Sequence, residues 1–231
     1  MYHPRYVEHK RPLNEVPVES RIPAEIGGFK TDVIEKGHDV LISLEGVHQR
    51  PIVDGLEITR GTTKGAAGSV CCFVNKRTKT AVGYEIDSDV YMLSAAHVLD
   101  PAGGADGDAV YQPKWPDLCA AKADLNWAND AGLARLGRGV TWKNEIHGVG
   151  PIDPLSLREF GPQVADSAVL RQTVRKQGRT TGLTTGVVTD ISYTYENKNL
   201  GRTFSDLLLI RSGPGQFGEE GDSGAPVFIG G

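Results

Sequence analysis

The sequence predicts an all-β protein, and three observations support this fold class. Glycine contributes 29 of the 231 residues, nearly twice the roughly 7% of average proteins, and 13 prolines accompany it. Short runs rich in β-branched and aromatic residues recur at fairly even spacing, bounded by glycine or charge, as strands are. No sustained apolar period of 3.6 residues competes with that pattern. Together these features favour a barrel or a sandwich.

Residues 1–60 are expected to form an N-terminal arm with short strands. The first 29 residues are rich in proline, glycine and charge, which favours an extended segment. Two apolar runs follow, at 31–34 and 39–44, and each has the composition of a short strand.

The β character strengthens after residue 60, and residues 61–141 are expected to form a first barrel. The run 69–74 has the composition of a buried strand. The polar stretch 75–78 predicts a turn, after which strand-like runs resume at 80–84 and 90–94.

Residues 142–172 are expected to link the two halves, because prolines interrupt this stretch at three positions, Pro151, Pro154 and Pro162. Residues 173–231 are then expected to form a second barrel. Its strand signals lie at 187–195, 207–210 and 225–229.

The charge balance excludes several classes of protein. The chain carries 25 Lys and Arg against 29 Asp and Glu, a net charge of −4. It lacks the basic surplus typical of phosphate-backbone binding, so we expect no nucleic-acid partner. No stretch approaches the roughly 20 apolar residues of a membrane-spanning helix. The first residues also lack the apolar centre of a secretory signal, so we expect a cytoplasmic protein without a membrane partner.

The cysteine pattern favours free thiols. The three cysteines are an odd count, and two of them are adjacent, Cys71 and Cys72. Adjacent cysteines rarely pair because the geometry is strained, which leaves one bridge from Cys119 to either of them as the alternative. Without a signal peptide, free thiols in a reducing compartment are expected. A zinc site would require a paired ligand spacing that is absent, and no metal or organic cofactor is expected.

The strongest local signal is the sequence GDSGAP at 221–226. A serine between glycines lies on a tight turn that exposes its hydroxyl group. The unhindered backbone amides of such a turn can converge on a developing oxyanion. An ordinary turn is the alternative interpretation, because Gly, Asp and Ser are common turn residues.

A serine hydroxyl becomes a nucleophile only when a base removes its proton, and His97 is the candidate base. It follows an apolar run, and the small residues at 94–96 let the backbone pack tightly enough to hold the imidazole in place. The alternative is a core histidine that closes a strand. The other histidines lie in the arm or in polar or glycine-rich stretches: His3, His9, His38, His48 and His147.

The base requires an acid that fixes its tautomer, and Asp130 is the candidate because it opens a run of small and apolar residues. Asp117 and Asp124 are competitors in more polar surroundings. Asp100 has the position of a turn or cap residue. For Asp130 itself, the alternative is a helix N-cap or a turn at a strand edge.

In chain order, the blocks SAAHV at 94–98, DAGLA at 130–134 and GDSGAP resemble the chymotrypsin/trypsin-like serine peptidases. More narrowly, the chain resembles the bacterial and plant trypsin-like group that includes the narrow-leaf proteins. The matching stretches span most of the chain beyond the first dozen residues, at 16–34, 50–52, 107–113 and 176–186.

The resemblance implies two chymotrypsin-like antiparallel β-barrels with a serine endopeptidase site in the cleft and a protein or peptide as substrate. Ser223 would be the nucleophile and His97 the general base, with Asp130 orienting it. The backbone N–H groups of Gly221 and Ser223 would form the oxyanion hole. Phe217, six residues before the nucleophile, would lie at the base of the pocket for the substrate's P1 side chain, where an aromatic floor argues against selection of Lys or Arg.

The sequence departs from this family at two places. Val98 follows the histidine where secreted members usually have a cysteine, which fits an intracellular enzyme. The family continues for several strands beyond the nucleophile, whereas this sequence ends at Gly231, so we expect a second barrel that is truncated at its C-terminus.

Two other functions stay open at this point. One is a catalytically silent module that acts in protein binding, because a fold does not dictate a function. The other is an intact triad that needs an activating or regulatory protein partner. A phosphate-binding loop at 179–186 would require a Gly-Lys-Ser/Thr ending that the sequence lacks, so a turn between strands is the simpler interpretation.

Overall fold

The chain divides into two compact units, Met1–Asp39 and Val40–Gly231. In the first unit, the described residues form an antiparallel pair of two-residue strands, β1 (Glu25–Ile26) and β2 (Phe29–Lys30). The strand expected at 31–34 and most of the one expected at 39–44 lie outside the described residues. The computed structural model describes residues 25–26, 29–30, 43–61, 67–100, 108–153, 168–198, 200–212 and 215–229.

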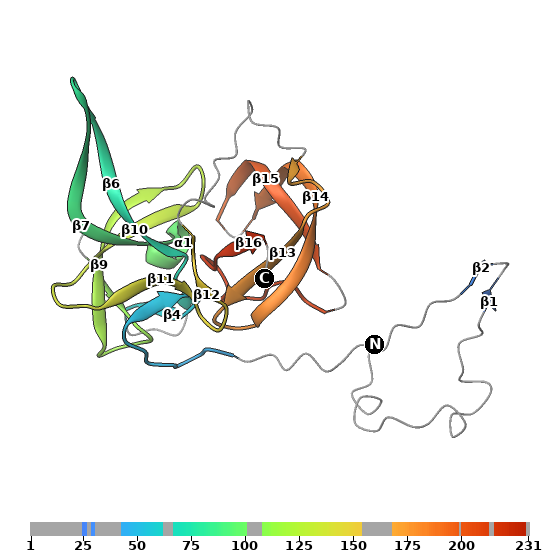
Figure 1. The fold of residues 1–231 in the computed structure, drawn as a ribbon, viewed down its shortest axis with the longest axis horizontal. Helices are drawn as coiled ribbons and strands as arrows, with labels where there is room; N and C mark the ends of the chain where they lie inside the picture. The colour runs from blue at the N-terminus through green and yellow to red at the C-terminus, as the bar shows by residue number, and fades with distance from the viewer. Residues whose placement is uncertain are drawn as a thin grey trace. The chain divides into compact units, whose positions relative to one another are not determined.

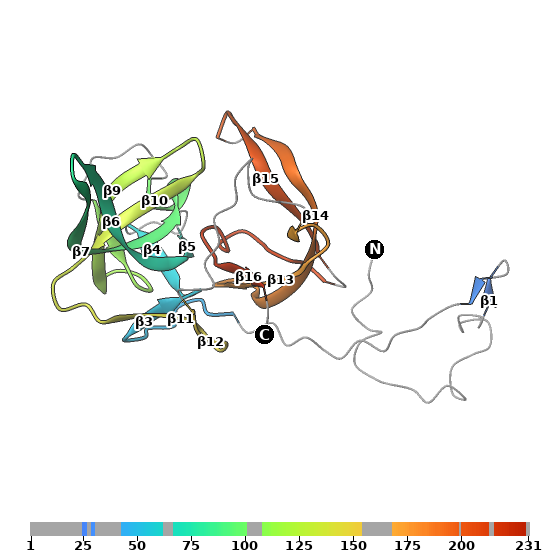
Figure 2. The same cartoon turned by 45° about the horizontal axis from the view of Figure 1, so that its top comes forward.

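The second unit is almost entirely β-structure, and its strands gather in two halves (Figures 1 and 2). The first half is built on a seven-stranded antiparallel sheet in the order β5-β4-β8-β9-β10-β7-β6. A single short helix, α1 (Ala96–Leu99), follows β7 directly. The strands are β4 (Glu57–Arg60), β5 (Ala67–Ser69), β6 (Cys72–Thr80), β7 (Gly83–Ala95), β8 (Ala109–Tyr111), β9 (Leu118–Asn126) and β10 (Ala131–Leu136).

A small three-stranded sheet accompanies the first half, with β11 between two partners. The strand β11 (Trp142–Ile146) runs parallel to β3 (Ile52–Asp54) and antiparallel to β12 (Gly150–Pro151). The boundaries therefore differ from the expected ones, because β3 and β4 belong to the folded half and not to an arm, and the expected linker begins with β11. The physical reason is burial: Ile52, Leu56 and Ile58 have no exposed surface and supply part of the core.

The second half is a four-stranded antiparallel sheet in the order β15-β14-β13-β16. Its strands are β13 (Thr173–Gly178), β14 (Gly182–Asn197), β15 (Arg202–Ser212) and β16 (Val227–Ile229). All three strand signals expected in this half fall on these strands. The strands β14 and β15 form a long ribbon (Figure 1).

The two halves differ in the size of their apolar cores. Among the described residues, the first half has one cluster of fifteen buried side chains. The second half has three, Val169, Val174 and Val188, with Phe217 among the partly buried side chains around them. Because each buried Val, Leu, Ile or Phe contributes about 1.5–3 kcal/mol, the first half is the stronger scaffold. Polar contacts carry more of the second half. Among the described helices, none is long and apolar enough to span a membrane.

The prediction of a turn at 75–78 is wrong. The strand β6 continues through it, and the chain reverses at 81–82, where Thr80 pairs with Gly83. Pairing with β7 keeps this stretch in a strand, because β7 supplies hydrogen-bond partners that lie outside the local sequence. The side-chain amide of Asn75, for example, donates to the backbone carbonyls of Asp87 and Asp89 on β7.

Candidate active site

His97 lies on the single turn of helix that ends β7. The register of β7 with β10 pairs Ala95 with Ala131, so the start of α1 lies beside the residue that precedes β10. That residue is Asp130, whose carbonyl accepts a hydrogen bond from the Ala96 N–H at 3.0 Å. Sheet register, and not a long helix, therefore positions the imidazole.

Asp130 holds His97 at two points. Its Oδ1 accepts the backbone N–H of His97 at 3.0 Å, and its Oδ2 lies 2.6 Å from the ring Nδ1. A carboxylate on Nδ1 assigns the proton to that nitrogen, which leaves Nε2 as the acceptor. Asp130 has a positive φ of 49°, a conformation that Asp tolerates better than most residues, so the backbone turns to present the carboxylate.

The competing aspartates lie elsewhere. Asp124 pairs with Lys76, and Asp117 lies 3.8 Å from His48. Asp100 is the C-cap residue of α1, as its position in the sequence suggested, and pairs with Arg60 at 2.8 Å.

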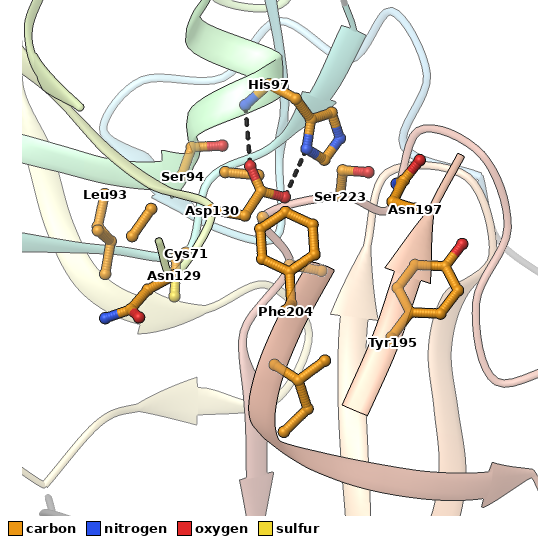
Figure 3. A pocket seen from close by; sticks show the side chains of 15 residues that line it. Cys71, Leu93, Ser94, His97, Asn129, Asp130, Tyr195, Asn197, Phe204 and Ser223 are labelled. Atoms are coloured by element: carbon orange, nitrogen blue, oxygen red, sulfur yellow. Dashed lines mark hydrogen bonds and ion pairs between the residues drawn. The ribbon is translucent and has the colours of Figure 1, made fainter. Parts of the chain in front are cut away.

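Ser223 lies in the turn before β16 and faces the same cavity as His97 and Asp130. The cavity has a volume of about 450 Å³. Figure 3 shows the serine side chain beside the imidazole and the Asp130 carboxylate on the ring's Nδ1. The structure thus brings together three side chains that are separated by 33 and 93 positions in the chain.

Ser69 on β5 ties the serine turn to the first half of the unit. Its N–H donates to the Ser223 carbonyl at 2.8 Å, and its hydroxyl donates to the Gly221 carbonyl at 3.2 Å. The same hydroxyl accepts the Arg179 N–H at 3.0 Å. One serine therefore sets the position of the turn relative to β5 of the first half.

The backbone of the turn suits the expected oxyanion hole. Gly221 has a φ of +96°, which favours glycine, and it is buried. Within the described part of the chain, the N–H groups of Gly221 and Ser223 donate to no protein acceptor. Asp222 between them donates to the Glu219 carbonyl at 3.0 Å. Two amides of the turn are thus free to bind a ligand oxygen.

A buried ion pair beneath the turn was not expected from the sequence. Lys176 Nζ lies 2.8 Å from Asp222 Oδ2, and the two side chains are only 4% and 5% exposed. The Lys176 ammonium also donates to the Thr181 hydroxyl and, at 3.4 Å, to the Gly182 carbonyl. The lysine opens the sequence KQGRTTG at 176–182, within the stretch 176–186 that resembles the narrow-leaf group, and nothing in that local sequence points to its partner.

The Asp222 carboxylate accepts four further hydrogen bonds. They come from Thr180 N–H at 2.8 Å, Thr181 N–H at 3.2 Å, the Thr181 hydroxyl at 2.5 Å and Glu219 N–H at 3.0 Å. Burial alone would raise the pKa of Asp222, but the hydrogen bonds from Lys176, Thr181 and the backbone outweigh it, so the pKa is lowered. The carboxylate is therefore charged and fixes the backbone on either side of it.

Phe217, the expected base of the P1 pocket, lies away from the cavity around Ser223, and its role there stays a prediction. It packs against the small apolar core of the second half, its carbonyl accepts the Thr184 hydroxyl at 2.6 Å, and it is not among the side chains that line the cavity around Ser223. The ribbon of β14 and β15 forms that wall instead. Its lining residues, none of which the sequence singled out, are Tyr195, Asn197, Phe204 and Leu207.

The ribbon also reaches the first half. The Arg202 guanidinium at the start of β15 stacks on the ring of Trp127, 4.9 Å from its centroid, in the turn before Asp130. A cation–π contact of this kind contributes about 0.5–2 kcal/mol. It holds the tip of the ribbon near the acid that orients the histidine.

The structure agrees with the prediction of free thiols, since none of the three cysteines, Cys71, Cys72 and Cys119, forms a disulfide. Cys119 lies in the core, its thiol donates to the Val110 carbonyl at 3.3 Å, and burial raises its pKa to about 12. It is therefore unreactive at neutral pH.

Known proteins resemble this chain at two levels, a partial family match and a shared fold. A family model described as the Nal1 C-terminal domain matches residues 133–231. This is less than half of the chain, so the narrow-leaf subgroup stays a prediction. A search of curated protein sequences found no match.

Solved structures match over most of the chain. A glutamic acid-specific serine protease that uses a histidine triad in substrate binding is 19% identical, with a TM-score of 0.55 over 78% of this chain and 80% of that one. Thermobifida fusca protease A is 18% identical, with a TM-score of 0.53 over 78% of each chain. Cellulomonas bogoriensis chymotrypsin is 18% identical, with a TM-score of 0.51 over 77% of each chain. At these identities the likeness establishes the fold, and the chain has the all-β, two-barrel fold of chymotrypsin-like serine proteases.

Proposed function

We propose that the protein is a serine endopeptidase that hydrolyses peptide bonds through an acyl-enzyme. The observation that carries this proposal is the double contact of Asp130 with the backbone and ring of His97, beside Ser223 in one cavity. A histidine closing a strand would need no carboxylate on its ring nitrogen. A serine in an ordinary turn would need no histidine next to it.

Each group has a defined chemical role in this reaction. His97 Nε2 removes the proton from Ser223 Oγ as the oxygen attacks the carbonyl carbon of the substrate. Asp130 stabilises the imidazolium that forms and keeps Nε2 directed at the reaction. The same nitrogen then gives the proton to the leaving amine, and water hydrolyses the acyl-enzyme by the reverse sequence.

The free amides of Gly221 and Ser223 supply the electrostatic part of the reaction. They would donate to the oxyanion of each tetrahedral intermediate, and removing one such donor costs roughly 10²–10³ in rate. The ion pair of Lys176 with Asp222 supports this role, since it holds the backbone between the two amides.

The proposed substrate is a protein or peptide without a charged side chain at the cavity. Apart from His97 and Asp130, the described residues that line the cavity include no Lys, Arg, Asp, Glu or His. Burying an unpaired charge there would be costly, so Leu207 and Phe204 favour an apolar side chain.

A fluorophosphonate probe tests the proposal, because it labels only an activated serine. We expect the full chain to be labelled at Ser223 and the Ser223→Ala variant to be unlabelled. The matched control Ser192→Ala, at an exposed serine on β14, should label like the wild type. Asp130→Asn should lower the labelling rate by about 10⁴-fold while the fold is retained.

The two other functions predict different results. A folded wild-type chain that resists the probe, alone and with cell extract, would favour a silent binding module. Labelling that appears only after a protein is added would instead show a triad that needs a partner. Casein cleavage that tracks labelling across the variants identifies the reaction as proteolysis.

A further inference from the structure

A β-bulge at the start of β6 places two thiols side by side. The Cys71 N–H donates to the Leu93 carbonyl at 2.9 Å, and Cys72 is the register partner of the same Leu93, after which Phe73 pairs with Met92. Two residues facing one define a bulge. In a regular strand, adjacent side chains point to opposite faces of the sheet. The bulge interrupts this alternation, so the two thiols are not forced onto opposite faces.

Burial along this segment shows the same irregularity. Val70 and Phe73 are 0% and 3% exposed, and between them Cys71 and Cys72 are both half-buried. A regular alternation would bury one cysteine and expose the other. Both cysteines therefore keep part of their surface exposed.

The two thiols influence each other's ionisation. Hydrogen bonding with the neighbouring thiol raises the pKa of Cys71, and burial adds to the effect. The same bond lowers the pKa of Cys72, although burial opposes it. The geometry thus gives the pair two unequal members, of which Cys72 is the more readily ionised.

A buried carboxyl group accompanies the pair. Asp54 on β3 is completely buried, and neither of its side-chain oxygens has a hydrogen-bond partner in the described part of the chain. Burial first, and then the charges of Cys72 and Glu145, raise its pKa to about 9. At neutral pH Asp54 is therefore protonated, and it adds no negative charge that would oppose a thiolate at Cys72.

The pair also borders the candidate active site. Cys71 lines the cavity that holds His97, Asp130 and Ser223, and Figure 3 shows its sulfur among the cavity side chains. A reagent small enough to enter the cavity therefore has a route to Cys71, and Cys72 next to it is itself only half-buried.

We propose that Cys71 and Cys72 form a reactive vicinal dithiol, a modification site for low-molecular-weight disulfides. Cys72 attacks as the thiolate and forms a bond to one sulfur of the reagent, whose other sulfur leaves as a thiolate and takes up a proton. The Cys71 thiol then loses its proton and attacks Cys72 Sγ, which releases the second half of the reagent as a thiol. Two protein thiols are oxidised to a disulfide, and one disulfide is reduced to two thiols.

We expect the disulfide between Cys71 and Cys72 to be easily reduced. Adjacent Cα atoms are about 3.8 Å apart, below the usual Cα separation of roughly 4.4–6.8 Å across a disulfide. Strain of this kind makes a disulfide easier to reduce, and it is typical of labile disulfides. A mild reductant should restore both thiols.

Modification at this position should also affect the cavity. Because Cys71 is part of its wall, ring closure or an attached glutathione changes the surface next to Ser223. We expect slower fluorophosphonate labelling after oxidation and recovery after reduction. This consequence rests on the proposed protease function, whereas the thiol chemistry does not.

The test exposes the reduced, folded full chain to glutathione disulfide, then unfolds it in urea, alkylates the remaining thiols and measures peptide masses. We expect the peptide with both cysteines to lose two hydrogens and resist alkylation, while Cys119 stays alkylated in the same sample. Cys71→Ser should stop at a glutathione adduct on Cys72, and Cys72→Ser should lose the adduct. The control Cys119→Ser should behave like the wild type.

Phenylarsine oxide provides a second measurement, because it binds tightly only where two thiols meet. The wild type and Cys119→Ser should retain one equivalent per chain, and either single variant of the pair should retain none. Full alkylation of both cysteines after glutathione disulfide, or arsenical retained by Cys72→Ser, would overturn the proposal. Ser223→Ala should form the same disulfide, so failure of the protease proposal can be told apart from failure of this one.

Discussion

Replacing Lys176 by Met tests whether the buried ion pair holds the serine turn. The substitution keeps the length of the apolar stem and removes the ammonium group. Asp222 is then left with a side chain that is charged and 5% exposed, supported only by its hydrogen bonds from Thr180, Thr181 and Glu219. The turn on which Ser223 lies would lose its central anchor.

The size of the effect follows from the burial of both partners. Breaking one side of a buried pair costs about 3–5 kcal/mol, because the remaining charge is uncompensated. The four other hydrogen bonds to Asp222 persist, so we expect the lower end, about 3 kcal/mol. That is a large part of the roughly 5–15 kcal/mol by which domains are stable.

Urea unfolding followed by tryptophan fluorescence measures the loss of stability. A change of about 3 kcal/mol moves the midpoint by roughly 1 M or more. The matched control is Lys143→Met at an exposed lysine on β11, which should stay within about 0.5 kcal/mol of the wild type. Fluorophosphonate labelling of Lys176→Met should be slower under conditions in which the variant is folded.

A double variant separates charge from packing. In Lys176→Met with Asp222→Asn the buried charge is gone, so the loss of stability should be smaller than in Lys176→Met alone. The reasoning is refuted if Lys176→Met unfolds at the same urea concentration as the wild type, or if the double variant is less stable than either single variant.

Three further results are expected. Because folding lowers the pKa of Asp222, its carboxylate stabilises the folded state above its unfolded pKa of about 3.8, and this stabilisation is lost as the pH falls through the lower folded value. The stability of Asp222→Asn should therefore depend less on pH below pH 4 than that of the wild type in an acid titration. An unchanged curve would contradict this. Gly224→Ala should lose more than about 1 kcal/mol, since Gly224 has a φ of +84° and a Cβ there would lie 2.3 Å from Ser94 Oγ and 2.6 Å from the Ser69 carbonyl; Gly46→Ala, at φ +73° with open space, controls for backbone strain in the same melting experiment. Val82→Lys at the tip of the β6–β7 ribbon, where Val82 is 98% exposed, should leave the melting temperature nearly unchanged, and a clear drop would show that this tip has a structural contact.

Local signals in the sequence predicted the fold class and the candidate site residues. Strand-forming runs at 187–195 and 207–210 are strands in the structure, because β-branched and aromatic side chains suit a pleated surface whatever they pair with. The blocks around His97, Asp130 and Ser223 were recognisable because the proposed chemistry needs particular residue types within a few positions.

Local signals failed where a distant partner decides the outcome. The polar stretch at 75–78 has turn-forming residues, yet pairing with β7 keeps it in a strand. The end of the expected arm was misplaced for the same reason, since Ile52 and Ile58 are core residues only because β3 and β4 meet strands from later in the chain.

The sequence by itself determined that this chain is built from short strands and which hydroxyl, imidazole and carboxylate are candidates for catalysis. Only the tertiary structure decided that Lys176 neutralises Asp222, that Phe204 and not Phe217 borders the cavity, and that a bulge joins two thiols beside it. These features depend on strand register and on contacts between residues far apart in the chain, and no short window of sequence contains both partners.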